Sequence, residues 1–176
     1  MPRSRGEESE TAASRLVATV AAMTLIDEVE LRPAVTTDPD IVTLTTAQQA
    51  ELAGIYGDDQ PLAGLHTDIQ FILLLVGGTP VGCVGLQPVA PGLGEIKRMY
   101  VEPASRGWGL SRLLLAEAEA KALHLGLTRL RLETGTAQRE AVSLYTHRGY
   151  TPTPPYPPFE HEPASLCFAK ELTQAG

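Results

Sequence analysis

The sequence predicts an α/β fold, in some schemes α+β, that is built on a central mixed sheet. Two observations predict it. Three strand-like segments follow one another through short glycine-containing turns, which is typical of an antiparallel meander. Helix-like and strand-like segments then alternate to the C-terminus, which is typical of helices packed on a sheet. A length of 176 residues, with 43% hydrophobic and 20% charged residues, suits one globular domain.

The N-terminal part is expected to hold a tail, one strand and one or two short helices. We interpret residues 1–22 as a flexible tail and residues 23–176 as the domain, although residues 16–23 could instead form a docked helix. Residues 28–32 alternate like a strand, which is expected to stop at Pro33. Thr45 is expected to cap a helix that ends at Gly57, and residues 61–66 are expected to form a turn or a second short helix.

The rest of the chain supplies the sheet and its main helices. Strands are expected at 69–76, 81–88 and 95–101, followed by a helix from Leu110 to Leu125 that Gly126 closes. The apolar stripe of this helix is expected to hold Leu110, Leu113, Leu114, Ala118, Ala122 and Leu125. A strand at 128–134, a helix at 138–148 and a last strand at 164–172 complete the pattern, and the prolines between 152 and 163 predict an irregular loop.

Composition and charge exclude several classes of protein. A net charge of -7 argues against a nucleic-acid-binding protein, and the longest apolar run, FILLLV, is too short to span a membrane. We find no secretory signal, so a cytoplasmic location is expected. Most of the 14 basic residues are arginines, which is typical of GC-rich bacterial genomes. Cys83 and Cys167 are expected to be free, buried thiols, and no histidine or cysteine spacing predicts a metal site.

The stretch RGWGLS, residues 106–111, is expected to bind an anion. It lies between a strand and a helix, and the first N–H groups of a helix have no partner within the helix and favour negative charge. Gly107 and Gly109 would let the backbone approach a phosphate, and Arg106 could add a charged donor. The dinucleotide pattern GxGxxG and the P-loop pattern are both absent, so neither NAD nor a nucleoside triphosphate is indicated.

Residues 95–150, from EIKRMYVEPASRGWGLSRLLLAEAEA to SLYTHRGY, resemble the GNAT superfamily of acetyl-CoA-dependent N-acetyltransferases. Arg106 and Gly109 match the family pattern [RQ]-x-x-G-x-[GA], in which Ser111 replaces the usual Gly or Ala. The resemblance implies a mostly antiparallel sheet of about six to seven strands, flanked by about four helices and splayed between the fourth and fifth strands.

The resemblance also implies a site. Coenzyme A would be bound by Met99, Tyr100, Val101, Arg106, Gly107, Trp108, Gly109, Leu110, Ser111, Gln138 and Tyr145. Tyr145 matches the tyrosine that commonly acts as general acid toward the sulfur, and its alternative role is packing the helix on the sheet. Gln138 replaces the usual asparagine and could equally be a surface residue at a helix N-terminus. Glu95 matches a strand carboxylate that serves as base in some members, and it could equally pair with Lys97.

The function implied is an N-acetyltransferase that moves an acetyl group from acetyl-CoA to the primary amine of a small molecule or amino acid, by direct attack and without a metal. The alternative is a non-catalytic coenzyme A-binding or regulatory module. Asp58, Asp59, Glu160 and Glu162 make two variable loops acidic, which favours an ammonium-bearing acceptor. Members of the family are often dimers, so the resemblance also allows a homodimer.

Overall fold

A computed structural model describes residues 28–57 and 67–173 of the chain. The N-terminal tail and the turn or helix expected at 61–66 lie outside the described residues. A seven-stranded sheet runs through the domain in the order β1-β2-β3-β4-β5-β7-β6. Its strands are β1 (Val29–Ala34), β2 (Gln70–Val76), β3 (Thr79–Ala90), β4 (Leu93–Val101), β5 (Arg129–Gly135), β6 (Thr151–Pro152) and β7 (Ser165–Glu171).

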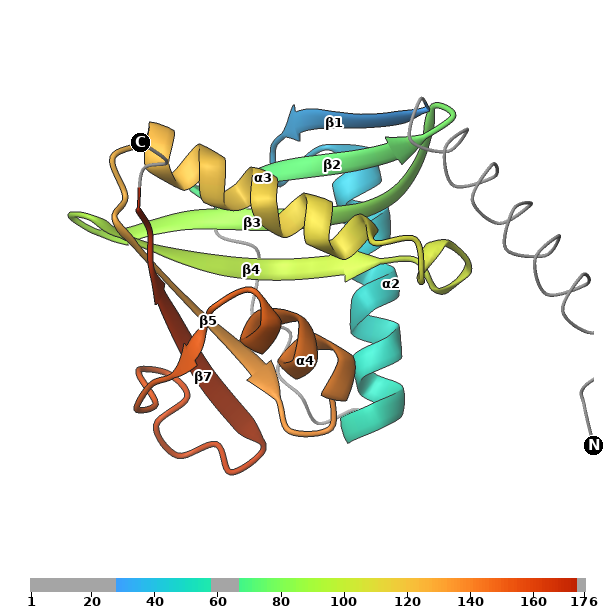
Figure 1. The fold of residues 1–176 in the computed structure, drawn as a ribbon. Coiled ribbons are helices and arrows are strands. Elements are labelled where there is room, and N and C mark those ends of the chain that lie inside the picture. Colours follow the sequence, from blue (N-terminus) through green and yellow to red (C-terminus); the bar gives the residue numbers. More distant parts are fainter. Residues whose placement is uncertain (1–27, 58–66, 174–176) are drawn as a thin grey trace, which may run out of the picture.

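All neighbouring strands are antiparallel except β4 and β5, which run parallel. The described residues also form three α-helices, α2 (Pro39–Tyr56), α3 (Leu110–His124) and α4 (Arg139–His147), and a short 3-10 helix, η1 (Pro103–Ser105). Helices α3 and α4 lie on one face of the sheet and α2 lies on the other (Figure 1). The mixed, mostly antiparallel sheet with its initial meander confirms the predicted fold class. None of the helices in the described part is long and apolar enough to cross a membrane.

The start of α2 differs from the prediction. Asp38, not Thr45, is the N-cap, and its carboxylate accepts a hydrogen bond from the backbone N–H of Asp40 at 3.0 Å. Pro39 occupies the first turn, where its missing N–H costs nothing. Thr45 lies inside the helix, and its hydroxyl donates to the carbonyl of Ile41 at 2.7 Å. The predicted end at Gly57 is confirmed.

Two smaller expectations are also corrected. Strand β1 continues through Pro33 to Ala34, which is tolerated because β1 is the outermost strand that the structure describes at this edge. On α3, Leu114, Ala118 and Ala122 are fully buried as predicted, whereas Leu113 and the C-cap residue Leu125 are exposed. Leu115, which was not expected in the stripe, is fully buried and widens it on the other side.

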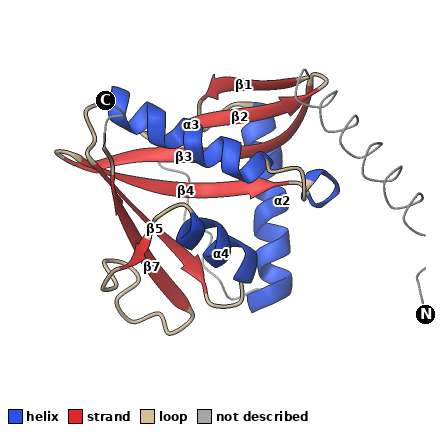
Figure 2. Ribbon diagram, in the orientation of Figure 1, coloured by secondary structure: helices blue, strands red, loops and turns tan. Residues whose placement is uncertain are grey.

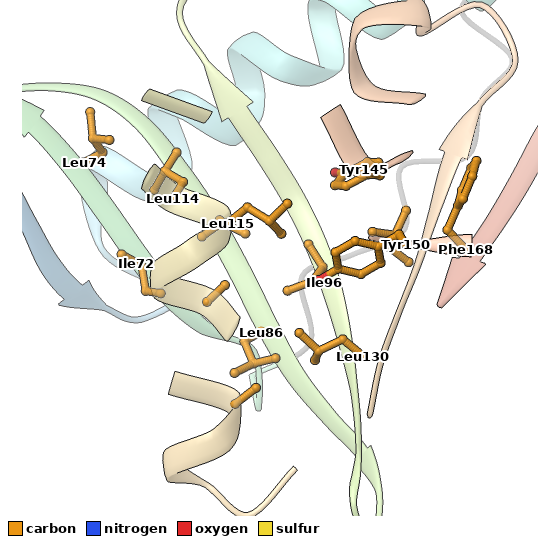
Figure 3. Close-up of a cluster of buried hydrophobic side chains, with 14 of the residues drawn as sticks. Ile72, Leu74, Leu86, Ile96, Leu114, Leu115, Leu130, Tyr145, Tyr150 and Phe168 are labelled. Atoms are coloured by element: carbon orange, nitrogen blue, oxygen red, sulfur yellow. The ribbon is translucent and has the colours of Figure 1, made fainter. Parts of the chain in front are cut away.

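The main core lies between the sheet and the two helices α3 and α4. Figure 3 shows this core: Leu114 and Leu115 of α3 face the sheet near Leu74 and Ile96, and Tyr145 of α4 and Tyr150 just after it complete the cluster toward Phe168. A smaller core joins α2 to the other face, through Ile41, Leu44, Phe71, Leu73, Cys83 and Tyr100. Cys83 and Cys167 are free and buried, as the sequence predicts.

Candidate active site

Strands β4 and β5 form a fork, which we define as the opening between them beyond their last paired residues. Their parallel pairing runs only from Leu93↔Arg129 to Ile96↔Leu132. Beyond that point β4 stays paired with β3 and β5 stays paired with β7, and the two strands diverge (Figure 1). The splay between the fourth and fifth strands is therefore present where the sequence predicts it.

A bulge in β4 accompanies the divergence. Cys83 pairs with Tyr100 and Gly85 with Lys97, so two steps along β3 oppose three along β4. Arg98 takes up the extra residue with φ of 52°, a backbone conformation that is unusual for a side chain other than glycine. Neighbouring groups hold the bulge: the Cys83 thiol lies 3.5 Å from the Arg98 carbonyl, and Gln48 of α2 donates to the Met99 carbonyl at 2.8 Å.

The loop 106–109 leads from η1 into α3, as the tan connection in Figure 2 shows. Gly107 and Gly109 have φ of 86° and 80°, and Gly109 is the N-cap of α3 in the left-handed conformation. A Cβ atom at either glycine would meet nothing within 4 Å, so open space borders the backbone here. Within the described residues no side chain caps α3, which leaves the first N–H groups of the helix, beginning at Leu110, for an anion.

Arg106 contacts protein groups. Its Nε donates to the Val101 carbonyl at 2.8 Å and its terminal nitrogen lies 2.7 Å from Glu51 of α2, while its guanidinium lies over the Tyr100 ring at 5.6 Å. The hydrogen bond to Glu51 raises the pKa of Arg106. Arg106 therefore fixes the end of β4 to α2, and a direct contact with an anion stays a prediction.

A groove of about 630 Å³ lies between the start of α3 and α4. Its polar lining comprises Ser111, Arg112, Arg139, Glu140, Ser143 and Arg148, among other residues. The Nε atom of Arg148 is buried and has no hydrogen-bond partner among the described residues. Three arginines and two hydroxyls beside a helix N-terminus make this groove suitable for phosphate groups, although the chain as a whole is acidic.

Tyr145 of α4 lies beside the fork, on the face of the sheet that carries α3 and α4. Its hydroxyl donates to the sulfur of Met99 at 3.3 Å, so α4 and β4 bring together two residues that are distant in the sequence. The side chain is 5% exposed, and burial raises the pKa of its hydroxyl, which therefore stays protonated at neutral pH. The Met99 thioether is a weak hydrogen-bond acceptor. A stronger acceptor that replaced it beside the Tyr145 hydroxyl could therefore readily take the hydroxyl proton.

Glu95 lies in the paired part of β4, one residue before the fork opens, on the face of the sheet that α2 covers. It is 3% exposed. Its Oε1 lies 2.6 Å from the Lys97 ammonium, and its Oε2 accepts from Arg131 at 2.8 Å. The structure thus shows the ion pairing that the sequence allowed for Glu95, with both carboxylate oxygens engaged. The role of Glu95 as a base stays a prediction.

Glu133 of β5 was not predicted as a site residue. It follows Leu132, the last residue of β5 that pairs with β4, and so lies at the opening of the fork. One of its oxygens accepts from the Ser165 hydroxyl at 2.5 Å. Burial raises the pKa of Glu133 from 4.5, and the nearby charge of Glu95 adds to this effect. The signal in the sequence was the alternation of RLRLET, which places Arg131 and Glu133 on the same face of the strand.

Gln138 is the N-cap residue of α4, and its side chain makes no capping hydrogen bond. Nearby, the Tyr56 hydroxyl at the end of α2 accepts from the backbone N–H of Ala137 at 3.1 Å. A Cβ atom at Gly135 would collide with this hydroxyl, which explains the glycine at the end of β5. Helix α2 thus contacts both sides of the fork, through Gln48 to β4 and through Tyr56 to the segment after β5.

Comparisons with known proteins agree with this geometry. Residues 39–150 match the Acetyltransferase (GNAT) family. An IAA acetyltransferase from Azospirillum brasilense is 39% identical over 106 residues, which are 60% of this chain and 69% of that protein. A crystal structure from Klebsiella pneumoniae, provisionally named as an acyl-CoA N-acyltransferase, is 31% identical with a TM-score of 0.72, covering 82% of this chain and 98% of its own.

The fold is shared more widely. A GNAT family acetyltransferase from Elizabethkingia anophelis, solved with acetyl-CoA bound, is 20% identical with a TM-score of 0.65, and the match covers 83% of this chain and 99% of that one. The fold agrees with the resemblance seen in the sequence, since it has the forked sheet, the glycine loop before α3 and the tyrosine of α4. The protein is an acyltransferase, and it belongs to the GNAT acetyltransferase family.

Proposed function

We propose that the protein transfers an acetyl group from acetyl-CoA to the primary amine of a small molecule or amino acid. The observation that carries this proposal is the fork, which has a protonated tyrosine, Tyr145, on one face of the sheet and a partly buried carboxyl, Glu133, on the other. The named relative from Azospirillum and the acetyl-CoA-bound neighbour support the donor, while the amine acceptor is proposed from the chemistry of the site.

Coenzyme A would be held along β4, the loop and the groove. The N–H groups around Gly107, Trp108, Gly109 and Leu110 suit its pyrophosphate, because their glycines leave open space and the helix end favours negative charge. The arginines of the groove suit its remaining phosphate. The main chain of Met99, Tyr100 and Val101 borders the fork, where the pantetheine arm and the thioester would lie.

The chain's own residues would then handle the protons. Glu133 takes one proton from the acceptor ammonium and leaves a neutral amine as nucleophile. Attack forms the C–N bond and breaks the C–S bond, and Tyr145 gives its proton to the departing sulfur. The nitrogen loses a second proton, which replaces the one that Tyr145 gave. A backbone N–H of β4 aimed at the carbonyl oxygen would contribute about 3 kcal/mol, as in other oxyanion holes.

The first test uses Trp108, the single tryptophan of the chain, which is 47% exposed within the loop. Titration with coenzyme A is expected to change the fluorescence of Trp108 and to raise the melting temperature of the protein. A coenzyme A concentration of 100 times Kd adds about 2.7 kcal/mol to the free energy of unfolding. If neither signal changes at millimolar coenzyme A, the proposed donor is wrong.

Gly109→Ala is expected to weaken coenzyme A binding roughly tenfold or more, because alanine strains the left-handed N-cap and its methyl group enters the space beside the loop backbone. Gly126→Ala is the matched control, since Gly126 has φ of 75° and equally open space at the other end of α3. Both variants are expected to lose about 1–2 kcal/mol of stability. Equal coenzyme A affinity in the two variants would contradict the assignment of the loop.

Gln48→Met is expected to lower kcat roughly tenfold, because one hydrogen bond to the Met99 carbonyl, worth about 1 kcal/mol, helps hold the bulged part of β4. The matched control is Gln49→Met, the same change at the next position of α2. Acetyl transfer measured by thiol release compares the two variants. A similar kcat in both would show that Gln48 does not position β4.

A further inference from the structure

The acceptor side of the fork carries a group of four charged residues, which we call the fork cluster: Glu95, Lys97, Arg131 and Glu133. Glu95 of β4 pairs with Arg131 of β5 in the strand register, and Lys97 and Glu133 each lie two residues further along their own strands. Side chains two apart on a strand share a face, so all four lie on the face that α2 covers mainly over β2, β3 and β4.

Within the fork cluster, two cations share one buried carboxylate. Glu95 is shared by two cations, with 2.6 Å to Lys97 and 2.7 Å to the terminal nitrogen of Arg131. Within the described part of the chain, Lys97 has Glu95 as its single ion-pair partner, so two of its three N–H donors are left for a ligand. Arg131 is held from behind by the ring of Tyr156, which lies 3.8 Å from its guanidinium carbon.

Both cations remain accessible from the fork. The side chains of Lys97 and Arg131 are 28% and 24% exposed, whereas that of Glu95 is 4% exposed. A ligand that enters from this face therefore meets the cations, while the carboxylate that pairs with them lies beneath.

The proton transfer of the reaction gives the cluster one positive charge in excess. Once Glu133 has taken a proton from the acceptor, the cluster keeps Glu95 as its one negative charge against Lys97 and Arg131. The attacking nitrogen then becomes positive as the C–N bond forms, and nearby like charge disfavours that step. A negative group on the acceptor would remove this repulsion and occupy the unused donors of Lys97.

We propose that the acceptor is an amino carboxylate, with its carboxylate close to the acetylated amine and bound by Lys97, and that Arg131 and Glu95 hold Lys97 in position. This inference rests on the proposed acetyl transfer and adds to it the class of acceptor. Lys97 would be a specificity-determining residue, because its ammonium would contact one part of the acceptor and leave the reacting nitrogen to Glu133.

The test compares three forms of each acceptor: the amino acid, its carboxamide and the amine that lacks the carboxylate. A panel of the common amino acids in these forms is assayed for thiol release from acetyl-CoA. We expect the wild-type kcat/KM for the best amino acid to exceed those of its amide and amine by about 10- to 100-fold, the range for a hydrogen bond between charged groups.

Lys97→Gln is expected to reduce this preference to less than about threefold, and Lys97→Arg is expected to restore most of it, because arginine keeps the charge. The matched control is Lys170→Gln, since Lys170 has a similar exposure of 23% and pairs with Glu119 at 2.8 Å outside the fork cluster. This control is expected to keep the wild-type preference. Melting temperatures verify that each variant is folded.

The outcomes separate this inference from the proposed function. Turnover of amino acids, amides and amines at equal rates, or an equal loss for all three in Lys97→Gln, would overturn the amino carboxylate and leave acetyl transfer intact. Unchanged Trp108 fluorescence with coenzyme A, together with no turnover of any compound, would overturn the proposed function, and this inference with it.

Discussion

Tyr145→Phe is expected to lower kcat by about 10²- to 10³-fold, the usual contribution of a general acid. The hydroxyl is the single group removed, and it donates to a weak acceptor, the Met99 sulfur, at 3.3 Å. Because this bond is weak, stability should change little, and the affinity for coenzyme A should stay within about threefold. Initial rates of thiol release at saturating acetyl-CoA, with a panel of amines, measure the effect.

The matched control is Tyr150→Phe. The Tyr150 ring packs against that of Tyr145, with 5.7 Å between the centroids, and it is equally buried in the core. Removal of its hydroxyl changes the same core without changing the fork, so kcat is expected to stay within about twofold of wild type. If both variants lose activity equally, the role of Tyr145 is packing, which is the alternative that the sequence left open.

The burial of Tyr145 also predicts how stability depends on pH. Burial raises the pKa of Tyr145 above its ordinary value near 10, so its proton should be retained throughout the range from neutral pH to about pH 10. The folded state binds this proton more tightly than the unfolded chain does. The resulting stability is present below the unfolded pKa and is lost as pH rises through the folded pKa, so Tyr145→Phe should be less sensitive to alkaline unfolding than wild type.

The fold could be predicted from the sequence because its signals are local. Glycine turns and apolar runs define the meander, and the long apolar stripe with Gly126 defines α3. The errors also have local causes. Helix α2 begins at Asp38–Pro39 and not at the predicted cap Thr45, although an aspartate followed by proline is itself typical of a helix start.

The site could be predicted only in part. The glycine loop and Tyr145 have characteristic spacing, but the bulge at Arg98 has none, because nothing in an arginine favours positive φ. Tertiary contacts from Cys83 and Gln48 hold it there. The position of Glu133 likewise depends on where β4 and β5 separate, which the pairing beyond Ile96↔Leu132 decides. No local pattern distinguishes it from Glu95.

Glu133→Gln is expected to lower kcat/KM by about 10²-fold or more at neutral pH, because glutamine cannot take a proton from the acceptor. Glutamine has nearly the same shape and its amide oxygen can still accept from Ser165, so the local structure should remain. In wild type, the rise of kcat/KM with pH should contain an acidic limb whose midpoint lies above the ordinary glutamate value of 4.5, since burial raises the pKa of Glu133. Rates of thiol release between pH 5 and 9 should show this limb in wild type and not in the variant.

Stability separates a catalytic carboxylate from a structural one. A carboxyl whose pKa is raised by folding stabilises the fold when protonated, below about pH 4.5, and this contribution is lost as pH rises through the folded pKa. Ionised Glu133 therefore costs stability at pH 7, and Glu133→Gln should melt at the same temperature as wild type or higher while losing activity.

Glu95→Gln is the contrasting variant. It leaves Lys97 and Arg131 without their shared carboxylate, so it should lower the melting temperature and keep the acidic limb. Loss of the limb in Glu95→Gln and its retention in Glu133→Gln would instead assign the base to Glu95.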